Sequence, residues 1–537
     1  MTAARLKSPR FLLGLIALLT AIAVQPGDLG SIDTVRRLQV THWMWTSAPQ
    51  VAPGEFPGFG VPGRNGHIYA WYGLGQSLLM LPGDVAVTAL IHAVPALRGK
   101  DELRALLLSY SLSPLICTLA VLAAFDLLQQ LGFSIRQSAG GALGLLFATT
   151  FLHYTQNMME NNLLLLLMLS GLRFQCVWLW TGSKRSLAAG SMLLGAGMLV
   201  RLTVALDCIA AGLFIAGALW LSSRESLAHR LWEYVKVCAP FYLGYALIDR
   251  AYHFYRFGQC CTNYIGLYGE QARRMDPSLP ANFPYTLPFW QGFLGPLISP
   301  EKSVFLFDPL LIVVIVIACI AWHSLASHIK ALIVAMTILL LAYMAFHARL
   351  FFWGGDVAWG DRYLTTPVQM LALLALPLVL RHGAHLGKTF WLGTKAIISL
   401  SVIFQIESLL MPAWVEFRQA DRLGHPIFVI GRRLVNVVAF ITGKLWGWQI
   451  ESRPDLASSW SKSIYLYPFR LAHEAMHAPH WISQLLIVCW VLLLCVLAAA
   501  IVRLRAALGN EHFREPEYNG WFGAYRSTNQ RSTEVIT

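Results

Sequence analysis

The sequence predicts an all-α integral membrane protein, built as a polytopic bundle of helices. Of its 537 residues, 56% are hydrophobic and only 13% are charged, whereas a soluble domain carries roughly 25% charged residues. Apolar runs recur that are long enough to cross a hydrocarbon core of about 30 Å. Only helices or closed barrels span lipid, and these runs are continuous rather than alternating, which indicates helices.

The apolar runs predict about twelve membrane-spanning helices. The stretch 74–97 is also apolar, but two prolines and a Gly-Asp pair interrupt it, so we expect an interfacial helix in the first external loop rather than a full crossing. The predicted spans are residues 8–25, 104–128, 138–155, 162–182, 186–201, 202–222, 231–250, 303–324, 328–348, 363–381, 390–411 and 481–505.

The basic residues predict the orientation of the bundle. With the N-terminus inside, every short inside loop carries a Lys or Arg, as the positive-inside rule requires. The outside loops are long and rich in Gly, Pro and aromatic residues, so we expect the polar chemistry on the external face. These loops are residues 26–103, 154–161, 251–302, 349–362 and 412–480.

The same pattern predicts the organisation of the chain and its location. Residues 1–411 form the transmembrane catalytic region, 412–480 an external or interfacial segment, 481–505 the last transmembrane helix and 506–537 a cytoplasmic tail. Short inside loops, and a tail without an ER-retention signal, favour a multi-pass protein of the bacterial cytoplasmic (inner) membrane with its active site facing the periplasm. The stretch 426–449, with Arg432, Arg433 and several Trp, is typical of an interfacial amphipathic helix.

The net charge of +13 does not indicate a nucleic-acid partner. The Lys and Arg residues are scattered through short loops rather than gathered on one face. Anionic headgroups of membrane lipids explain them better, and some are candidates for substrate phosphate. Most of the nine Cys lie in apolar segments, and no Cys/His spacing indicates zinc.

Two acidic residues in the predicted external loops are catalytic candidates. Asp33 follows the first span, and a carboxylate at the boundary between lipid and water is suited to take a proton from an acceptor hydroxyl. The alternative is a solvated Asp that caps the next helix. Glu160 lies between two spans on the same side as Asp33, where it either orients the acceptor or a metal or caps a helix with Asn161.

Three cations are candidates for binding the phosphate of a substrate. Charges in or near spans are costly and usually have a partner or a function. Arg201 breaks an apolar run at the outside end of its helix, Arg256 lies near the membrane, and Lys302 precedes a span. Snorkelling to headgroups is the alternative.

The loop from Trp353 to Leu364 combines glycines with aromatic and charged residues. Glycines permit close approach of the backbone to a ligand. Trp359 offers an apolar face to a sugar ring, and Asp361 and Arg362 offer hydrogen bonds to hydroxyls or phosphate. An interfacial aromatic belt with a glycine turn is the alternative.

In their order along the chain, these segments resemble the polytopic GT-C glycosyltransferases, a superfamily that includes protein O-mannosyltransferases and the aminoarabinose transferase of lipid A. The resemblance covers roughly residues 8–411. It rests on Asp33 after the first helix, the segment from His67 to Pro82 that contains Tyr69, and three motifs: Arg256-Phe257-Gly258, Ser299-Pro300-Glu301-Lys302 and Trp359-Gly360-Asp361-Arg362-Tyr363-Leu364.

The resemblance implies a polyprenyl-phosphate-linked sugar donor, a catalytic Asp in the first external loop and transfer on the outer face to a glycan, lipid or protein acceptor. Asp33 is then the general base and Glu160 an acceptor-side carboxylate, while Tyr69 and the loop with Trp359, Asp361 and Arg362 line the sugar and acceptor pocket. The chain has Ile-Asp-Thr at this point and lacks the paired Asp-Glu of the mannosyltransferase branch, which leaves the sugar, the acceptor and any divalent metal open.

Two other functions remain open on the sequence. A flippase or transporter for lipid-linked sugars needs polar groups through the full membrane depth and usually has pseudo-symmetric halves, and no internal repeat is visible. A membrane scaffold without catalytic activity would tolerate replacement of Asp33.

Overall fold

The computed structural model describes residues 8–222, 227–442, 464–473 and 480–509, and this part of the chain is almost entirely helical. Its one ribbon pairs β1 (Val61–Pro62) antiparallel to β2 (Ile68–Tyr69), with Val61 opposite Tyr69. The predicted all-α class is confirmed.

Long apolar helices form the bundle and pack closely through small residues. α7 (Glu160–Thr181) and α8 (Lys184–Val200) are joined by a turn at Gly182, whose φ is +71°. Where the two helices meet, a Cβ added at Gly190 would lie 2.7 Å from the carbonyl oxygen of Gly171. Only glycine permits this approach, which is typical of helix packing in membranes.

All twelve predicted spans fall on helix, but the structure does not support twelve crossings. Among the described residues, eight helices are long and apolar enough to cross a membrane, and two shorter apolar helices accompany them. The predicted span 138–155 is divided between α5 (Ile135–Ala148) and α6 (Phe151–Asn157), because the backbone at Thr149 is extended. The eight are Gly75–Ala93, Glu102–Gln130, Glu160–Thr181, Leu202–Ser222, Ser327–His347, Thr365–His385, Lys388–Leu409 and His480–Gly509.

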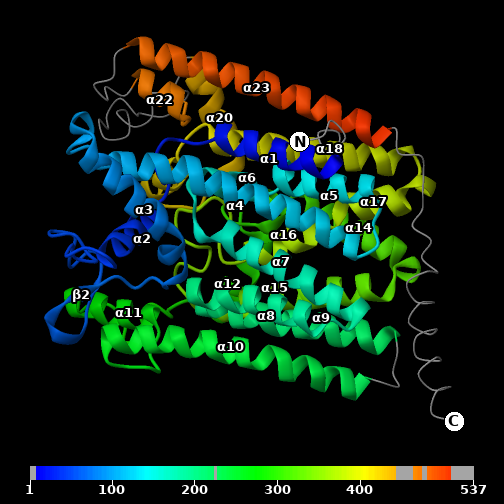
Figure 1. The fold of residues 1–537 in the computed structure, drawn as a ribbon, viewed down its shortest axis with the longest axis horizontal. Coiled ribbons are helices and arrows are strands. Elements are labelled where there is room, and N and C mark those ends of the chain that lie inside the picture. Colours follow the sequence, from blue (N-terminus) through cyan, green and yellow to red (C-terminus); the bar gives the residue numbers. More distant parts are fainter. Residues whose placement is uncertain (1–7, 223–226, 443–463, 474–479, 510–537) are drawn as a thin grey trace.

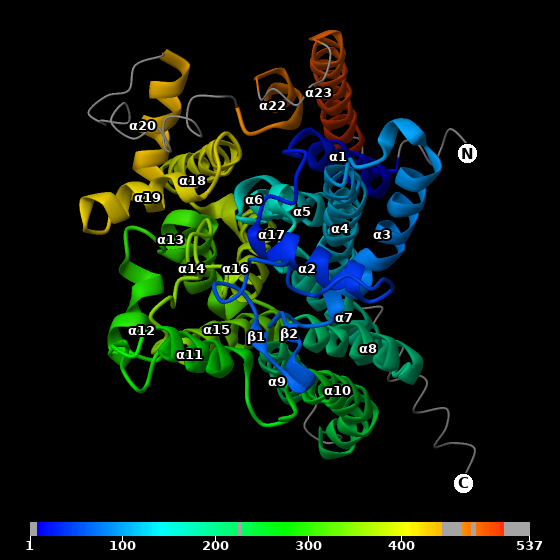
Figure 2. The same cartoon turned by 90° about the vertical axis from the view of Figure 1, so that its left-hand side faces the viewer.

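α3 (Gly75–Ala93) belongs to these eight by length and composition, although we predicted an interfacial helix there. Its orientation differs from that of the long helices. Figure 2 looks along α4 (Glu102–Gln130) and shows α3 from the side. α3 therefore runs across one end of the bundle, where it packs against α2 (Ile32–Trp43) and α4.

The segments predicted to be external gather at this same end. Figure 1 shows α2, α3, β2 and α11 (Tyr264–Met275) at the left-hand end of the long helices. α22 (Tyr467–His473) joins them, and the backbone N–H of Tyr467 donates to the carbonyl of Gln25 at 2.9 Å. Polar segments far apart in the sequence therefore meet next to the start of α2.

The remaining helices complete the bundle and its edges. α20 (Val429–Thr442) covers part of the predicted stretch 426–449, of which 443–449 lies outside the described residues. Arg433 on this helix is fully buried instead of facing headgroups. The others are α1 (Pro9–Ala23), η2 (Arg64–Gly66), η3 (Pro95–Leu97), η4 (Leu202–Val204), α9 (Ala205–Ser222), α10 (Leu227–Phe257), α12 (Phe289–Ile298), α13 (Val304–Phe307), α14 (Leu310–Ala321), η5 (Trp322–Ser324), α15 (Ser327–His347), α16 (Thr365–Ala372), α17 (Ala375–His382), η6 (Gly383–His385), α18 (Lys388–Leu409), α19 (Trp414–Leu423) and α23 (His480–Gly509).

Candidate active site

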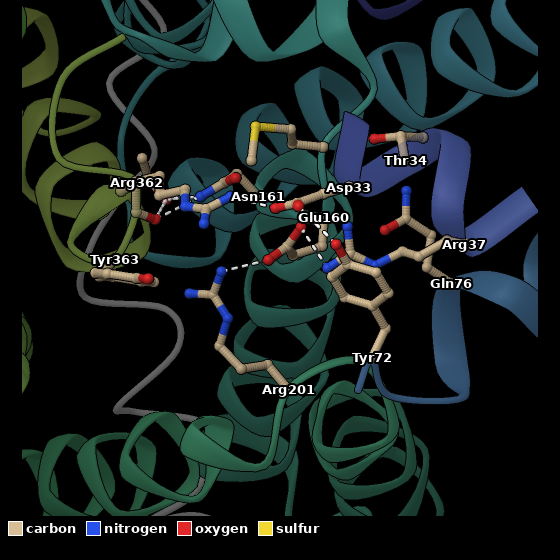
Figure 3. A network of polar contacts seen from close by, with 12 residues as sticks. Asp33, Thr34, Arg37, Tyr72, Gln76, Glu160, Asn161, Arg201, Arg362 and Tyr363 are labelled. Carbon is tan, nitrogen blue, oxygen red and sulfur yellow. Dashed lines mark hydrogen bonds and ion pairs between the residues drawn. The ribbon is translucent and has the colours of Figure 1, made fainter. Parts of the chain in front are cut away.

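α2 contributes two charged residues to the centre of the site. The backbone of Ser31 is extended, and α2 begins at Ile32, so Asp33 lies in the first turn of the helix. Arg37 lies four residues further on, and residues four apart share one face of a helix. α2 therefore presents a carboxylate and a guanidinium toward the start of α7 (Figure 3).

A tight turn between α6 and α7 brings Glu160 to the same place. Met158 lies in the left-handed region with φ 47°, and its carbonyl accepts hydrogen bonds from Thr34 Oγ1 at 3.2 Å and Gln76 Nε2 at 2.9 Å. A positive φ at a non-glycine residue is costly and persists where the surroundings hold it. The turn places Glu160 in the first turn of α7, where the helix dipole favours a carboxylate.

Three guanidinium groups meet two carboxylates at this point (Figure 3). Glu160 pairs with Arg37, at 2.9 Å between Oε2 and Nη2, and with Arg201 through Oε1. Asp33 pairs with Arg362 through Oδ2. The five side chains come from α2, α7, the junction of α8 with η4, and the loop before α16. One positive charge is in excess, so the cluster favours an anionic ligand.

Tyr72 and Asn161 fix the two ends of the cluster. The Tyr72 hydroxyl donates to Asp33 Oδ1 at 2.6 Å, and the Arg37 guanidinium lies 4.4 Å from the centre of the Tyr72 ring. This is a favourable cation–π distance. Asn161 Nδ2 donates to the backbone carbonyl of Arg362 at 2.6 Å, which holds the backbone of that residue against α7.

A column of aromatic rings lies next to Arg201. The Tyr363 ring lies under the Arg201 guanidinium at 5.4 Å and stacks on His347, with 4.3 Å between centroids and 6° between planes. His347 in turn stacks on Tyr343, whose hydroxyl donates to Asp207 at 2.6 Å. The column fixes Tyr363, and therefore the chain position of the neighbouring Arg362.

Exposure decreases from Asp33 toward Glu160. The side chains of Asp33 and Arg362 are 19% and 17% exposed, Arg201 is 10% exposed, and Arg37 and Glu160 are 5% each. Within the described part of the chain, the buried Nη1 of Arg37 and Nε of Arg362 have no hydrogen-bond partner. Because an unpartnered buried donor is costly, these atoms mark a place where an acceptor belongs.

The charges determine the protonation states at the exposed end. Burial raises the pKa of Asp33, but Arg362 and Arg37 outweigh it, and the pKa lies below its ordinary value. Burial lowers the pKa of Arg362, but the carboxylate of Asp33 outweighs burial, and the pKa lies well above its usual range. Burial and the nearby Asp33 raise the pKa of the Tyr72 phenol. At neutral pH Asp33 is therefore ionised and Tyr72 is a neutral donor.

This arrangement is suited to two chemical tasks. An ionised carboxylate near the water-accessible end can accept a proton, and forked guanidinium groups bind phosphate through paired hydrogen bonds. Among the described residues, no group of three or more His, Cys, Asp or Glu side chains could hold a metal ion.

Arg256 and Tyr69 lie one layer away from the carboxylates. The Arg256 side chain donates to the backbone carbonyls of Ala70 and Tyr72, the latter at 3.0 Å. Tyr69 packs edge-on against Phe257 at 6.0 Å. Arg256 was expected to bind phosphate, but in this structure its guanidinium bonds to the backbone of the segment that carries Tyr72.

Lys302 holds the loop that precedes Arg362. Lys302 is buried, with 5% of its surface exposed. Its Nζ donates to three backbone carbonyls of the loop, so its hydrogen bonds are satisfied there. Asp361 accepts a hydrogen bond from the backbone N–H of Tyr363 at 3.0 Å. The three carbonyls belong to Asp356 at 2.6 Å, Ala358 at 2.6 Å and Gly360 at 3.2 Å.

Trp359 is not available to stack a sugar in this structure. Its side chain is fully buried, and its ring meets Phe307 edge-on at 5.0 Å. Its carbonyl accepts a hydrogen bond from the Tyr154 hydroxyl at 2.8 Å. The residue thus packs the loop against the bundle.

Sequence reasoning missed four residues that contact the cluster. The four-residue spacing from Asp33 was a signal for Arg37. Tyr72 lay within a segment singled out only as a motif, and Asn161 was treated as a possible helix cap. Tyr363 had no signal beyond its place next to Arg362.

Comparison with known proteins leaves the family open. No protein-family model and no curated protein sequence matches the chain. Three solved chains match, among them the crystal structure of ArnT from Cupriavidus metallidurans bound to undecaprenyl phosphate. That likeness has a TM-score of 0.40 and 14% identity over 86% of this chain and 74% of the other. A likeness this loose assigns neither family nor function, so the function has to be inferred from the residues of the site.

Proposed function

We propose that the protein is an integral membrane glycosyltransferase that moves a sugar from a polyprenyl-phosphate donor to an acceptor on the external face. The observation that carries the proposal is the contact of Asp33 with an arginine cluster at the polar end of a helical membrane bundle. A lipid-linked donor needs a site at the membrane boundary, an acceptor hydroxyl needs a base, and the donor phosphate needs cations.

Asp33 is the general base in this proposal. It is ionised and lies at the most exposed end of the cluster, where an acceptor hydroxyl can approach. The acceptor oxygen loses its proton to Asp33 as it bonds to the anomeric carbon, and the bond from that carbon to the phosphate oxygen breaks with its electron pair. The polyprenyl phosphate leaves as an anion.

The arginines bind the donor phosphate and stabilise the leaving group. Of these, only Arg201 was expected in this role. Arg362, which was expected to line the sugar pocket, joins it through its pair with Asp33. Arg37 joins as well, since its Nη1 is a buried donor without a partner among the described residues. Glu160 was expected on the acceptor side. The 5% exposure of its side chain and its pairs with Arg37 and Arg201 instead favour a role in orienting the two guanidinium groups.

The test is transfer by the purified protein in lipid nanodiscs. A panel of radiolabelled polyprenyl-monophosphate sugars is offered with a glycan and lipid extract of the host envelope as acceptor. We expect one donor to lose its label to the acceptor fraction with wild type and not with Asp33→Asn. If no donor reacts, and the protein instead moves a fluorescent lipid-linked sugar across a vesicle bilayer, the chain is a flippase and the proposal is wrong.

A further inference from the structure

Each carboxylate oxygen of Asp33 already has a partner in this structure. Tyr72 donates to Oδ1 at 2.6 Å, and Arg362 takes Oδ2. A general base must offer a lone pair to the proton that it removes, and an ion pair reduces its basicity. In this state Asp33 is poorly suited to accept a proton.

Arg362 differs from the other two arginines of the cluster. Arg37 and Arg201 share the deeply buried Glu160, whereas Arg362 pairs with the more exposed Asp33 and is itself the most exposed of the three. Its Nε is a buried donor with no partner among the described residues. An anion that enters from the exposed end therefore meets the Arg362 guanidinium before the other two.

The backbone of Arg362 is held, so only its side chain has to move. Its carbonyl accepts from Asn161 at 2.6 Å, and the loop before it is fixed by Lys302. The stem of the side chain lies against Gly355, where an added Cβ would be 2.3 Å from Arg362 Cγ. A phosphate that replaces Asp33 as the partner leaves the guanidinium satisfied without a change of fold.

We propose that Arg362 is a donor-operated lock on Asp33: the donor phosphate takes its guanidinium, and Asp33 becomes a free base only when donor is bound. This rests on the proposed function. Donor then binds before acceptor chemistry begins, and the empty enzyme keeps its base ion-paired. The lowered pKa of Asp33 in the ligand-free protein is consistent with this state.

The test is a double-mutant cycle read by binding alone, with undecaprenyl monophosphate as the probe. Its affinity is measured in nanodiscs for wild type, Arg362→Gln, Asp33→Asn and the double variant. We expect Arg362→Gln to weaken binding about tenfold, since it removes a charge-assisted hydrogen bond. Asp33→Asn should tighten binding several-fold because it frees Arg362, and this gain should vanish in the Arg362→Gln background.

The controls separate exchange from simple charge effects and from misfolding. Arg64→Gln removes an exposed guanidinium of the first external loop and should leave the affinity unchanged. Arg362→Lys keeps the charge without the fork and should give a weaker site in a protein of wild-type melting temperature. The C55 alcohol without phosphate should not show the coupling.

Each outcome decides the proposal. A gain from Asp33→Asn that is equal in both backgrounds reflects charge repulsion alone and overturns the exchange. Equal affinity of wild type and Arg362→Gln also overturns the exchange of partners, because Arg362 then does not bind the phosphate. The transferase proposal survives that result, since the donor can bind elsewhere on the chain. A probe that binds no variant contradicts both.

Discussion

Two arginine–carboxylate pairs in this molecule differ in how deeply they are buried and in how many of the arginine's hydrogen-bond donors have a partner. Arg433 on α20 and Glu416 on α19 are both fully buried, and they form two hydrogen bonds at 2.7 and 2.6 Å. The remaining donors of Arg433 bond to four backbone carbonyls at the end of α18 and the segment after it. Arg362 and Asp33 are part-exposed, and Arg362 keeps an unpartnered Nε.

The difference separates a structural ion pair from one that is poised to exchange partners. A buried pair is stable only if its remaining hydrogen bonds are made, and Arg433 meets that condition. Arg362 does not, although the surrounding loop is well held by Lys302. Burial and completeness of hydrogen bonding, rather than charge, therefore distinguish the pair that ties α19 and α20 to α18 from the pair at the site.

The largest expected effect comes from Asp33. Asp33→Asn keeps the shape of the side chain and removes the base, so transfer should fall by about 10²- to 10⁴-fold. The measurement is the rate of sugar transfer in nanodiscs at saturating donor. Asp101→Asn, at an exposed carboxylate outside the cluster, should retain the wild-type rate. An active Asp33→Asn enzyme would remove Asp33 from the mechanism.

The comparison of the two pairs predicts opposite phenotypes. Arg433→Met leaves Glu416 as an unpaired buried charge and should cost about 3–5 kcal/mol of stability. Arg362→Met should cost less, because Asp33 is partly solvated, yet transfer should be lost. Unfolding in detergent and transfer rates are compared for both. Equal losses of stability would contradict the distinction.

Lys302 should show an intermediate effect. Lys302→Met removes three hydrogen bonds to the loop before Arg362, so stability should fall by about 2–3 kcal/mol and transfer should decrease with it. The readouts are unfolding in detergent and the affinity for polyprenyl phosphate. Lys184→Met, at a mostly exposed residue, should be neutral. Normal affinity in a destabilised Lys302→Met would show that the loop does not position Arg362.

The smallest expected effect is a shift in pH dependence. A base works only when ionised, so activity falls as pH drops through the pKa of Asp33, which Arg362 and Arg37 hold below its ordinary value of about 3.9. Arg362→Gln removes the largest cause that lowers this pKa, so it should move the acid limb of kcat/KM for the donor to higher pH. kcat/KM reports the free enzyme, in which Arg362 pairs with Asp33, whereas kcat reports the complex, in which the donor phosphate has taken Arg362. The acid limb of kcat in wild type should therefore lie at higher pH than the acid limb of kcat/KM. Coincident limbs would argue against the lock.

The same sign holds for stability. A lowered carboxyl pKa contributes stability above the unfolded value of about 3.9, and this contribution is lost as pH falls through the folded pKa. Arg362→Gln should therefore flatten the acid side of the stability curve, which a pH series of melting temperatures measures.

Much of the fold followed from the apolar runs, but the number of crossings did not. Hydropathy marks where a helix forms, not its direction, and α3 runs across the bundle although it is long and apolar. The break between α5 and α6 depends on a long-range contact, since Asp308 accepts a hydrogen bond from the backbone N–H of Thr150 at 2.7 Å. No local pattern indicates such a partner.

The site was predictable only where charge itself was the signal. Asp33, Glu160, Arg201 and Arg362 were singled out as charged residues near membrane ends, and the structure brings them together. Lys302 gave the same signal, yet its partners are backbone carbonyls, which no sequence pattern marks. Arg37 was not singled out, because the segment around it was treated as a loop. Once that segment is the helix α2, Arg37 lies on the same face as Asp33.

The most direct test of the central claim is made in cells that lack the protein. Glycans and lipid-linked sugars are profiled after complementation with wild type or Asp33→Asn at matched membrane levels. The account predicts that wild type alone restores a missing sugar and that its polyprenyl-phosphate form accumulates otherwise. Full complementation by Asp33→Asn would contradict it.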